Sequence, residues 1–375
     1  MEWNNHELFF KLIQAGLWSD NESTALRNYE VTDEVEWDNV YHLAEEQSVL
    51  GVVLAGIERL KRANVDVNIN PKLLLQWIGN VHLLEQRNKA MNVFIAELIE
   101  TLRKQDVYAV LVKGQGIAQC YERPLWRASG DVDLLLSDGN YKKAKDVLLP
   151  IATSREQEYI TFKHLGLLMN EGFLVELHGT LHSRLSKRVD NGIDVAQRSV
   201  FYGGNVRSWL NGNTLVFLPD PNDDVIFIFT HILHHYFIDG IGLRQICDWC
   251  RLLWTYKDSL NQELFESRIR GMGLMSEWKA FATLAVEYLG MPVEAMPLYE
   301  FQDSKVSDFK KKAEQIMKFV LESGNLRHNR RTAKGKVASA WNKTKNFIRH
   351  TRVFPLDSMK FFWHFLLDGI RLTMN

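Results

Sequence analysis

The stretch LVKGQGIAQCYERPLWRASGDVDLLL, residues 111–136, places two aspartates directly before a run of leucines. The apolar segment Asp131–Leu136 is typical of a β-strand, and side chains two residues apart in a strand point to the same face. Asp131 and Asp133 therefore project side by side. Two carboxylates this close repel each other unless a cation lies between them or one of them is protonated. Because an unpaired buried charge is strongly unfavourable, the pair indicates a cation site.

The residues before this strand supply groups that suit phosphate. A short strand over Val107–Val112 is predicted to end at Lys113-Gly114-Gln115-Gly116, and a short helix follows as far as Pro124. Glycines let backbone N–H groups come close to a phosphate, and Lys113 adds a positive charge. Arg127 adds a planar fork for phosphate oxygens. Together with the acids, this pattern favours transfer of a phosphorus group from a nucleoside triphosphate.

A third acid, Glu176, lies in another apolar strand, Phe173–His178, and His178 shares its face. Mg²⁺ prefers hard oxygen ligands and is commonly shared between carboxylates and substrate phosphates. Each element also has a structural alternative. Asp131 could close the turn after Gly130, and Glu176 could pair with an arginine such as Arg184.

The surrounding pattern predicts an α+β fold, in which a small mixed sheet is flanked by helical regions on both sides. The helical N-terminal region spans 1–105, the α+β core 106–218, a second helical region 219–322, and a basic, amphipathic segment 323–375. Further strands are predicted at Tyr159–Met169, Arg207–Leu210 and Thr214–Leu218. Helices are predicted at Val35–Leu60, Leu73–Arg103, Tyr141–Leu149, Asp223–Phe237, Leu243–Tyr256, Met275–Leu289 and Val306–Leu321.

Composition sets wider bounds. The 375 residues are 46% hydrophobic and 24% charged with a net charge of −1, which gives no general affinity for nucleic acid or anionic membrane. Three cysteines are too few for a disulfide framework and favour a reducing compartment. The start lacks the features of a signal peptide, and no apolar run is long enough to span a membrane. The expected localisation is cytoplasmic.

The segment KGQGIAQCYERPLWRASGDVDLLL, with the later VELH, resembles the DNA polymerase β-type nucleotidyltransferase superfamily. It is most similar to a little-characterised bacterial branch known only as nucleotidyltransferase family proteins. The close match covers about residues 113–178, and weaker similarity extends over THILHHYFIDGIGLRQICDW, residues 230–249. The superfamily usually has Gly-Ser in its nucleotide loop, whereas this chain has Gly114-Gln115.

The resemblance implies a Mg²⁺-dependent nucleotidyltransferase, with Mn²⁺ as an alternative ion, in which Asp131, Asp133 and Glu176 hold two metals. It places Lys113 and Gly114 in the nucleotide loop and makes Arg127 a phosphate or structural partner. An acceptor hydroxyl on a small molecule, sugar, peptide or protein attacks the α-phosphorus, and pyrophosphate leaves. Glu176 is either a metal ligand or the general base. The alternatives are a non-catalytic nucleotide-binding or interaction module and a nucleic-acid-directed transferase.

Two further features are candidates for binding. His231 and His235 lie one turn apart on a predicted helix, where they form either an interhelical polar network or a surface that faces substrate. Residues 323–356 contain no acid and many lysines and arginines, and residues 359–372 are amphipathic and rich in aromatics. The stretch 323–372 is therefore a candidate for contact with a polyanion or a membrane surface, or else a solvated basic face with a docked last helix.

Overall fold

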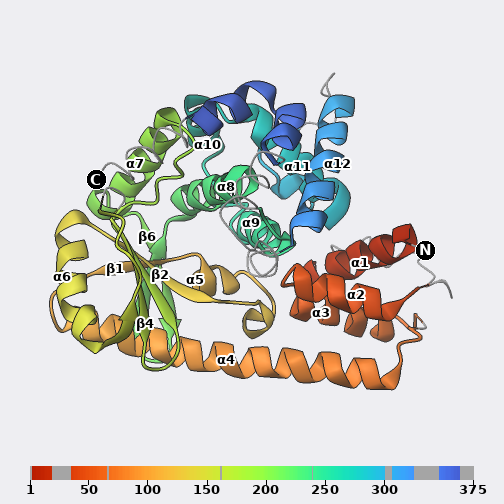
Figure 1. Ribbon diagram of the computed structural model, residues 1–375, viewed down its shortest axis with the longest axis horizontal. Helices are drawn as coiled ribbons and strands as arrows, with labels where there is room; N and C mark the ends of the chain where they lie inside the picture. Colours follow the sequence, from red (N-terminus) through yellow and green to blue (C-terminus); the bar gives the residue numbers. More distant parts are fainter. Residues whose placement is uncertain are drawn as a thin grey trace.

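The computed structural model describes residues 2–18, 35–65, 67–160, 163–238, 240–299, 306–324 and 346–363 (Figure 1). Helices precede, flank and follow a single seven-stranded sheet. The α-helices are α1 (Glu2–Leu17), α2 (Trp37–Glu46), α3 (Leu50–Arg62), α4 (Pro71–Arg103), α5 (Gly114–Ala118), α6 (Asp138–Leu148), α7 (Lys187–Tyr202), α8 (Pro221–Ile238), α9 (Leu243–Thr255), α10 (Gln262–Met272), α11 (Met275–Leu289) and α12 (Val306–Ser323). Short 3₁₀ turns are η1 (Pro124–Trp126), η2 (Leu149–Ile151) and η4 (Val293–Ala295). The strands are β1 (Ala109–Val112), β2 (Asp131–Leu136), β3 (Ala152–Arg155), β4 (His164–Met169), β5 (Leu174–His178), β6 (Val206–Asn211) and β7 (Thr214–Pro219).

The sheet is mixed, with the strand order β3-β4-β5-β2-β1-β7-β6. Strand β2 is parallel to β5, and β1 is parallel to β7, while the other neighbours are antiparallel. All the described strands come from one continuous part of the chain, and helices lie on either side of it in sequence. The α+β fold expected from the sequence is confirmed.

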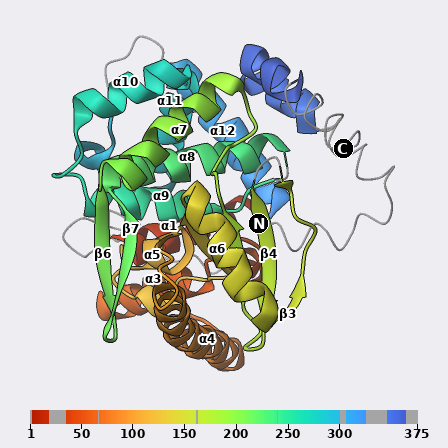
Figure 2. The same ribbon diagram turned by 90° about the vertical axis from the view of Figure 1, so that its left-hand side faces the viewer.

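The alternation of side chains along the central strands gives the sheet two different faces. On one face, Val132, Leu134 and Leu136 of β2 pack against α4 and α6 in one apolar cluster. In Figure 2, α4 is seen nearly end-on and α6 crosses in front of the sheet. On the other face, Leu135 joins the larger apolar cluster of the remaining helices. Because Asp131 and Asp133 alternate with the first set, they point to this second face.

Helix α4 is 33 residues long and runs beneath both the sheet and the N-terminal helices (Figure 1). Pro71 occupies its first turn, and the side chain of Asn70 caps it by accepting a hydrogen bond of 2.9 Å from the backbone N–H of Lys72. At its N-terminal end Trp77 packs in the cluster of the N-terminal helices, whereas Met91 and Leu98 pack under the sheet. One helix therefore belongs to both cores.

The N-terminal helices pack tightly because glycines lie where the backbones meet. A Cβ added to Gly16 of α1 would lie 2.0 Å from the carbonyl oxygen of Val52. One added to Gly56 of α3 would lie 2.0 Å from the carbonyl oxygen of Leu12. Larger residues at either position would force α1 and α3 apart, since a real Cβ cannot approach backbone this closely.

Glu277 of α11 is a fully buried acid, with 0% exposure. Neither of its carboxyl oxygens has a hydrogen-bond partner among the described residues. Burial, followed by the charge of nearby Asp357, raises the pKa of Glu277 to about 8. The side chain is therefore held in its neutral form at pH 7.

We expect Glu277→Gln to make the protein more stable at pH 8 than the unsubstituted chain. Between pH 4.5, the ordinary pKa of the group, and about 8, the folded protein keeps a proton that the unfolded chain releases. The stability of the unsubstituted protein consequently falls as pH rises, by up to about 1.4 kcal/mol per pH unit for one proton. Urea unfolding at pH 5 and pH 8 measures this: the two proteins should differ little at pH 5. The exposed Glu294→Gln is the control, and an equal gain at both pH values would contradict the explanation.

Most of the elements predicted from the sequence are confirmed, including both hairpins and the helix Met275–Leu289. The stretch Val35–Leu60 holds two helices rather than one, because the chain turns at Ser48, where φ is 56°. Strand β3 and helix α7 were not predicted, and the strand predicted over Tyr159–Met169 begins only at His164. Helices α1 and α10 lie in regions predicted to be helical, although their bounds were not predicted.

Much of the basic C-terminal segment lies outside the described residues, namely 325–345 and 364–375. Its contact with a polyanion or membrane surface stays a prediction. No helix within the described ranges combines the length and apolar character needed to cross a bilayer.

Candidate functional site

The sheet brings the three predicted acids to one face. In the parallel pair of β2 and β5, Asp133 lies directly opposite Glu176, and Asp131 lies opposite Leu174. Asp131 and Asp133 are two residues apart on β2, so their side chains share a face with that of Glu176. This is the face that the larger helical cluster covers. The acids project from adjacent central strands, which fix their positions more firmly than a loop would.

Asp133 is bound by two basic side chains. Lys113 Nζ lies 3.0 Å and His178 Nε2 lies 2.8 Å from the same oxygen, Asp133 Oδ1. Burial alone would raise the pKa of Asp133, but the charge of Lys113 and the hydrogen bond from His178 lower it overall. The opposing charges of Asp133 and Glu176 outweigh burial at Lys113 and raise the pKa of its amine. Asp133 is thus ionised at neutral pH, and no described residue bonds its second oxygen, Oδ2.

Glu176 is bound by two histidines. His164 Nε2 lies 3.3 Å and His178 Nε2 lies 3.4 Å from Glu176 Oε2. Burial raises the pKa of Glu176, but the hydrogen bonds from His164 and His178 outweigh it, so the pKa lies far below its usual range. Contacts with both Asp133 and Glu176 in turn raise the pKa of His178 against the effect of its burial. One imidazole therefore bridges two of the three acids.

The carboxylate of Asp131, unlike those of Asp133 and Glu176, has no hydrogen bond or ion pair with a side chain that the structure describes. Burial raises the pKa of its carboxyl, and the negative charges of Asp133 and Glu176 raise it further. The charge of Arg244 acts in the opposite direction. The positive charges of Arg244 and Lys113 act without a direct bond to the carboxylate of Asp131, which leaves its oxygens open to a bound cation.

The residues present fit a divalent cation that prefers oxygen. Asp131 has both oxygens unbonded, and one oxygen each of Asp133 and Glu176 has no partner among the described residues. Carboxylate oxygens are the ligands that Mg²⁺ takes, with water or phosphate completing its shell. The three carboxylates do not form a group of three within 4.8 Å of one another, whereas His164, Glu176 and His178 do. Asp131 and Asp133 would therefore hold Mg²⁺ with ligands from outside the protein.

The predicted nucleotide loop lies beside these acids. Its Lys113 side chain points toward Asp133, whereas its Gln115 side chain points into the protein interior. Lys113 adopts φ 58° and Gly114 φ 42°, which turn the chain from β1 into α5. The amine of Lys113 thereby reaches Asp133. Gln115 is 1% exposed and donates to Asn88 Oδ1 of α4 over 2.9 Å and to Ser129 Oγ over 3.2 Å. Its side chain faces the protein interior, and a role for Gln115 in binding nucleotide stays a prediction.

A Cβ added to Gly116 would lie 2.8 Å from Leu218 Cδ2. This glycine therefore allows close packing of α5 on β7. Its role in binding nucleotide stays a prediction.

Arg127 forms a buried ion pair. Its Nε lies 3.0 Å from Asp248 Oδ1, its Nη2 lies 2.6 Å from Asp248 Oδ2, and its Nη1 donates to Ser129 Oγ over 2.7 Å. The hydroxyl of Tyr121 also donates to Asp248, over 2.8 Å. All three guanidinium nitrogens are engaged in these bonds. Of the two roles that the resemblance implies for Arg127, the geometry favours the structural one, and phosphate binding stays a prediction.

The helices after the sheet place three more basic residues near the acids. His231 Nε2 and His235 Nε2 on α8 are 3.1 Å apart. Burial, and then the charge of Lys113 for His231 or of His234 for His235, lowers the pKa of both imidazoles well below the usual value. Both are therefore neutral at pH 7. Arg244 of α9 donates to the carbonyl of Ala128 over 3.0 Å, while its Nε is buried without a partner among the described residues.

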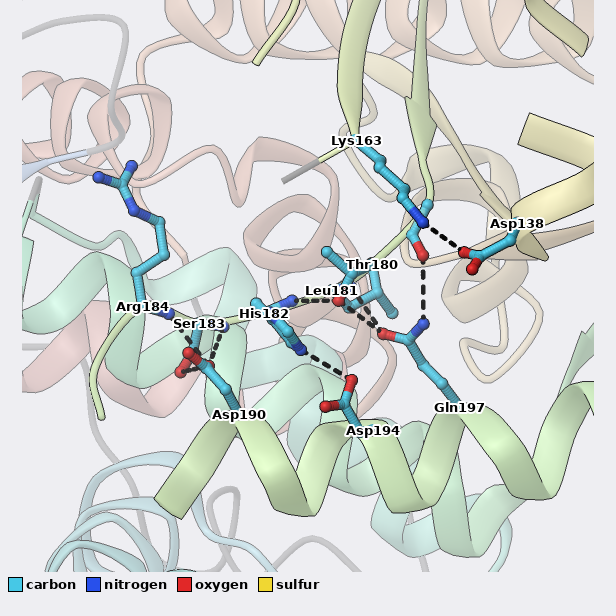
Figure 3. A network of polar contacts seen from close by, with 11 residues as sticks. Asp138, Lys163, Thr180, Leu181, His182, Ser183, Arg184, Asp190, Asp194 and Gln197 are labelled. Atoms are coloured by element: carbon cyan, nitrogen blue, oxygen red, sulfur yellow. Dashed lines mark hydrogen bonds and ion pairs between the residues drawn. The ribbon is translucent and has the colours of Figure 1, made fainter. Parts of the chain in front are cut away.

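The segment that follows β5 is hydrogen-bonded both to Lys163 and to α7, which fixes the end of the strand that carries His178 (Figure 3). The N–H of Gly179 donates to the carbonyl of Lys163 over 2.7 Å. Gln197 of α7 accepts from the N–H of Leu181 over 2.8 Å, and His182 Nε2 lies 2.7 Å from Asp194 Oδ1. These bonds hold the segment against α7.

Two residues of this site, His164 and Arg244, are absent from the set predicted from the sequence. His164 could have been found from the hairpin, because pairing the strands around Asn170-Glu171-Gly172 sets His164 opposite His178. No local signal marks Arg244, which lies 113 residues beyond Asp131 and meets the site only through the packing of α9.

The fold and the site together define an α+β protein whose central strands carry an acidic face beside a lysine and glycine turn. The family model described as uncharacterised nucleotidyltransferase matches residues 33–290, and the chain belongs to this family. The match extends from α2 through α11, so it covers the helices that surround the sheet as well as the sheet itself. No curated protein and no solved structure matches the chain.

Proposed function

We propose that the protein is a metal-dependent nucleotidyltransferase that moves a nucleoside monophosphate from a nucleoside triphosphate to an acceptor hydroxyl. The observation that carries the proposal is the shared face of Asp131, Asp133 and Glu176, on which the carboxylate of Asp131 makes no direct ion pair with a described residue. Membership of the nucleotidyltransferase family supports the same reaction class. Bound Mg²⁺ would shield the triphosphate charge and lower the pKa of the acceptor hydroxyl.

Lys113 and Arg244 supply positive charge for the triphosphate. Lys113 is anchored by Asp133 at the start of the nucleotide loop, and Arg244 lies close enough to Asp131 to shift its pKa. Both side chains come from rigid elements, the end of β1 and the first turn of α9. Fixed positive groups of this kind stabilise the charge that develops on transferred phosphate.

The geometry also bears on the proton of the acceptor. A carboxylate whose pKa lies far below its usual range is a weak base, so Glu176 suits the role of a ligand better than that of a general base. The pKa values of His231 and His235 also lie well below the usual value, so these neutral imidazoles are weak bases by the same argument. In the proposed step the acceptor oxygen bonds to the α-phosphorus and its proton passes to a base. The bond between the α-phosphorus and the oxygen that joins it to the β-phosphorus breaks, and pyrophosphate leaves.

A labelling experiment tests this reaction. The full-length protein with Mg²⁺ is incubated with triphosphates labelled at either the α- or the γ-phosphorus, together with a small-molecule pool or a protein pool as acceptor. We expect label to transfer from the α-position only, with an equal amount of pyrophosphate released. Transfer of the γ-label instead would show a kinase and contradict the proposal.

The second candidate is a nucleotide-binding module without catalysis. The observation in its favour is that Lys113 and His178 already neutralise Asp133, so one of the three acids is satisfied without metal. This candidate predicts that nucleoside triphosphates raise the melting temperature, while no pyrophosphate is released with either acceptor pool. The same labelling experiment therefore separates the two functions.

A further inference from the structure

The geometry points to a second, chemically different metal site at His164, Glu176 and His178, which takes a divalent transition metal of the Mn²⁺ to Zn²⁺ series. One ligand atom of each residue lies within 4.8 Å of the others. Both imidazole Nε2 atoms face the same carboxylate, at 3.3 Å and 3.4 Å from Glu176 Oε2. The three side chains thus already surround a common point.

The sheet prearranges these ligands. His164 and His178 are directly paired across β4 and β5, and Glu176 is two residues before His178 on the same face. The ring centroids of the two histidines are 4.8 Å apart. The side chains are 24%, 22% and 10% exposed for His164, Glu176 and His178, so the site is shielded while solvent still reaches it. Ligands on adjacent strands need little reorganisation to take up an ion.

The donor set decides which metal is favoured. Two neutral imidazole nitrogens and one carboxylate oxygen suit Mn²⁺, Fe²⁺, Co²⁺ and Zn²⁺, whereas Mg²⁺ prefers an all-oxygen shell. Asp131 and Asp133 present only oxygen. The two ends of the acidic face should therefore prefer different ions. The catalytic use of the second ion rests on the proposed function, but its binding does not.

Occupation of this site has a consequence for Asp133. His178 Nε2 lies 2.8 Å from Asp133 Oδ1. This nitrogen cannot donate a proton to Asp133 and bind a metal through its lone pair at the same time. Metal binding at His178 would remove one of the two contacts to this oxygen and leave the one from Lys113 at 3.0 Å. The carboxylate of Asp133 then has more capacity for an ion shared with Asp131, so loading of the two sites should be linked.

Metal titration of the full-length protein, stripped with a chelator, tests the site. Isothermal titration calorimetry should show one Mn²⁺ or Co²⁺ bound per chain, more tightly than Mg²⁺. We expect His164→Asn to weaken this binding at least about tenfold, as the loss of a metal-orienting group typically does. His182→Asn is the matched control, because His182 lies on the segment after the same strand and pairs with Asp194 instead. Its affinity should be unchanged.

The absorption spectrum of bound Co²⁺ provides a readout that does not depend on activity. Ligand-field bands without a thiolate charge-transfer band support the nitrogen and oxygen ligands, while a thiolate band would place the metal at cysteine and overturn the site. Glu176→Gln, which keeps the size of the side chain, provides a second test if His164→Asn does not fold. Unchanged Co²⁺ affinity in either folded variant would overturn the site.

The outcomes also separate this inference from the proposed function. Tight Mn²⁺ binding that depends on His164, in a protein without nucleotidyl transfer, would support the site and contradict the function. Transfer supported by Mg²⁺ in a chain that binds neither Mn²⁺ nor Co²⁺ would support the function and overturn the site.

Discussion

In the Asp131→Asn protein, nucleotidyl transfer should fall by about a thousandfold or more, while the melting temperature should not decrease. The carboxylate has no partner among the described residues, and burial with two neighbouring negative charges raises its pKa. Removal of its charge therefore relieves repulsion in the folded protein. It also removes the proposed anchor for a cation, which contributes several kcal/mol to the transition state of phosphoryl transfer. Label transfer and thermal unfolding measure the two effects.

Asp133→Asn should abolish transfer to the same extent but should also destabilise the fold. Lys113 and His178 would lose the negative partner that now lies 3.0 Å and 2.8 Å from them. Removal of one member of a buried charge pair costs about 3–5 kcal/mol. Asp138→Asn, at the exposed start of α6, is the control for both proteins. Substantial transfer by a folded Asp131→Asn protein would show that this acid has no part in catalysis.

A loss of stability as large as that of Asp133→Asn is expected for Arg127→Met. Arg127 and Asp248 each have 5% exposed side chains and make two hydrogen bonds to each other, and Asp248 also accepts from Tyr121. Removal of the cation leaves a buried carboxylate without its main partner. We expect the free energy of unfolding to fall by about 3–5 kcal/mol, measured by urea denaturation.

The control for this prediction is Arg270→Met. Arg270 pairs with Glu266 one turn away on α10, but its side chain is 62% exposed, and a surface pair of this kind contributes only about 0–1 kcal/mol. If Arg127 instead binds phosphate, its substitution would raise the KM for the nucleotide and leave the unfolding curve unchanged. The two readouts therefore distinguish a structural from a phosphate-binding role.

The central part of the fold was predictable because its signals are local. Alternation of apolar and charged residues marks β2, and turn residues at Asn170–Gly172 and Asn211–Asn213 mark the two hairpins. The shared face of Asp131 and Asp133 follows directly from their spacing. Glu176 was found by the same reasoning, as an acid within an apolar strand. The parallel pairing that sets Glu176 opposite Asp133 was not predicted, since it depends on how distant strands are ordered in the sheet.

The remaining parts of the site depend on contacts between residues far apart in the chain. The partner of Arg127 is Asp248, 121 residues away, and no sequence pattern joins them. The buried position of Gln115 depends on Asn88 of α4, which shares no motif with the loop. Strand β3 is short and mostly exposed, so it lacks the apolar alternation by which strands are recognised.

The long helix α4 connects the N-terminal helices to the sheet, because it packs against both. Asn88, near its middle, donates to the carbonyls of Leu125 and Arg127, each over 2.8 Å, and accepts from Gln115. A helix of 33 residues is about 50 Å long, so a tilt of its N-terminal end would also shift the loop that precedes the acidic strand. A partner that binds the N-terminal helices would therefore change the position of the acidic residues without contacting them.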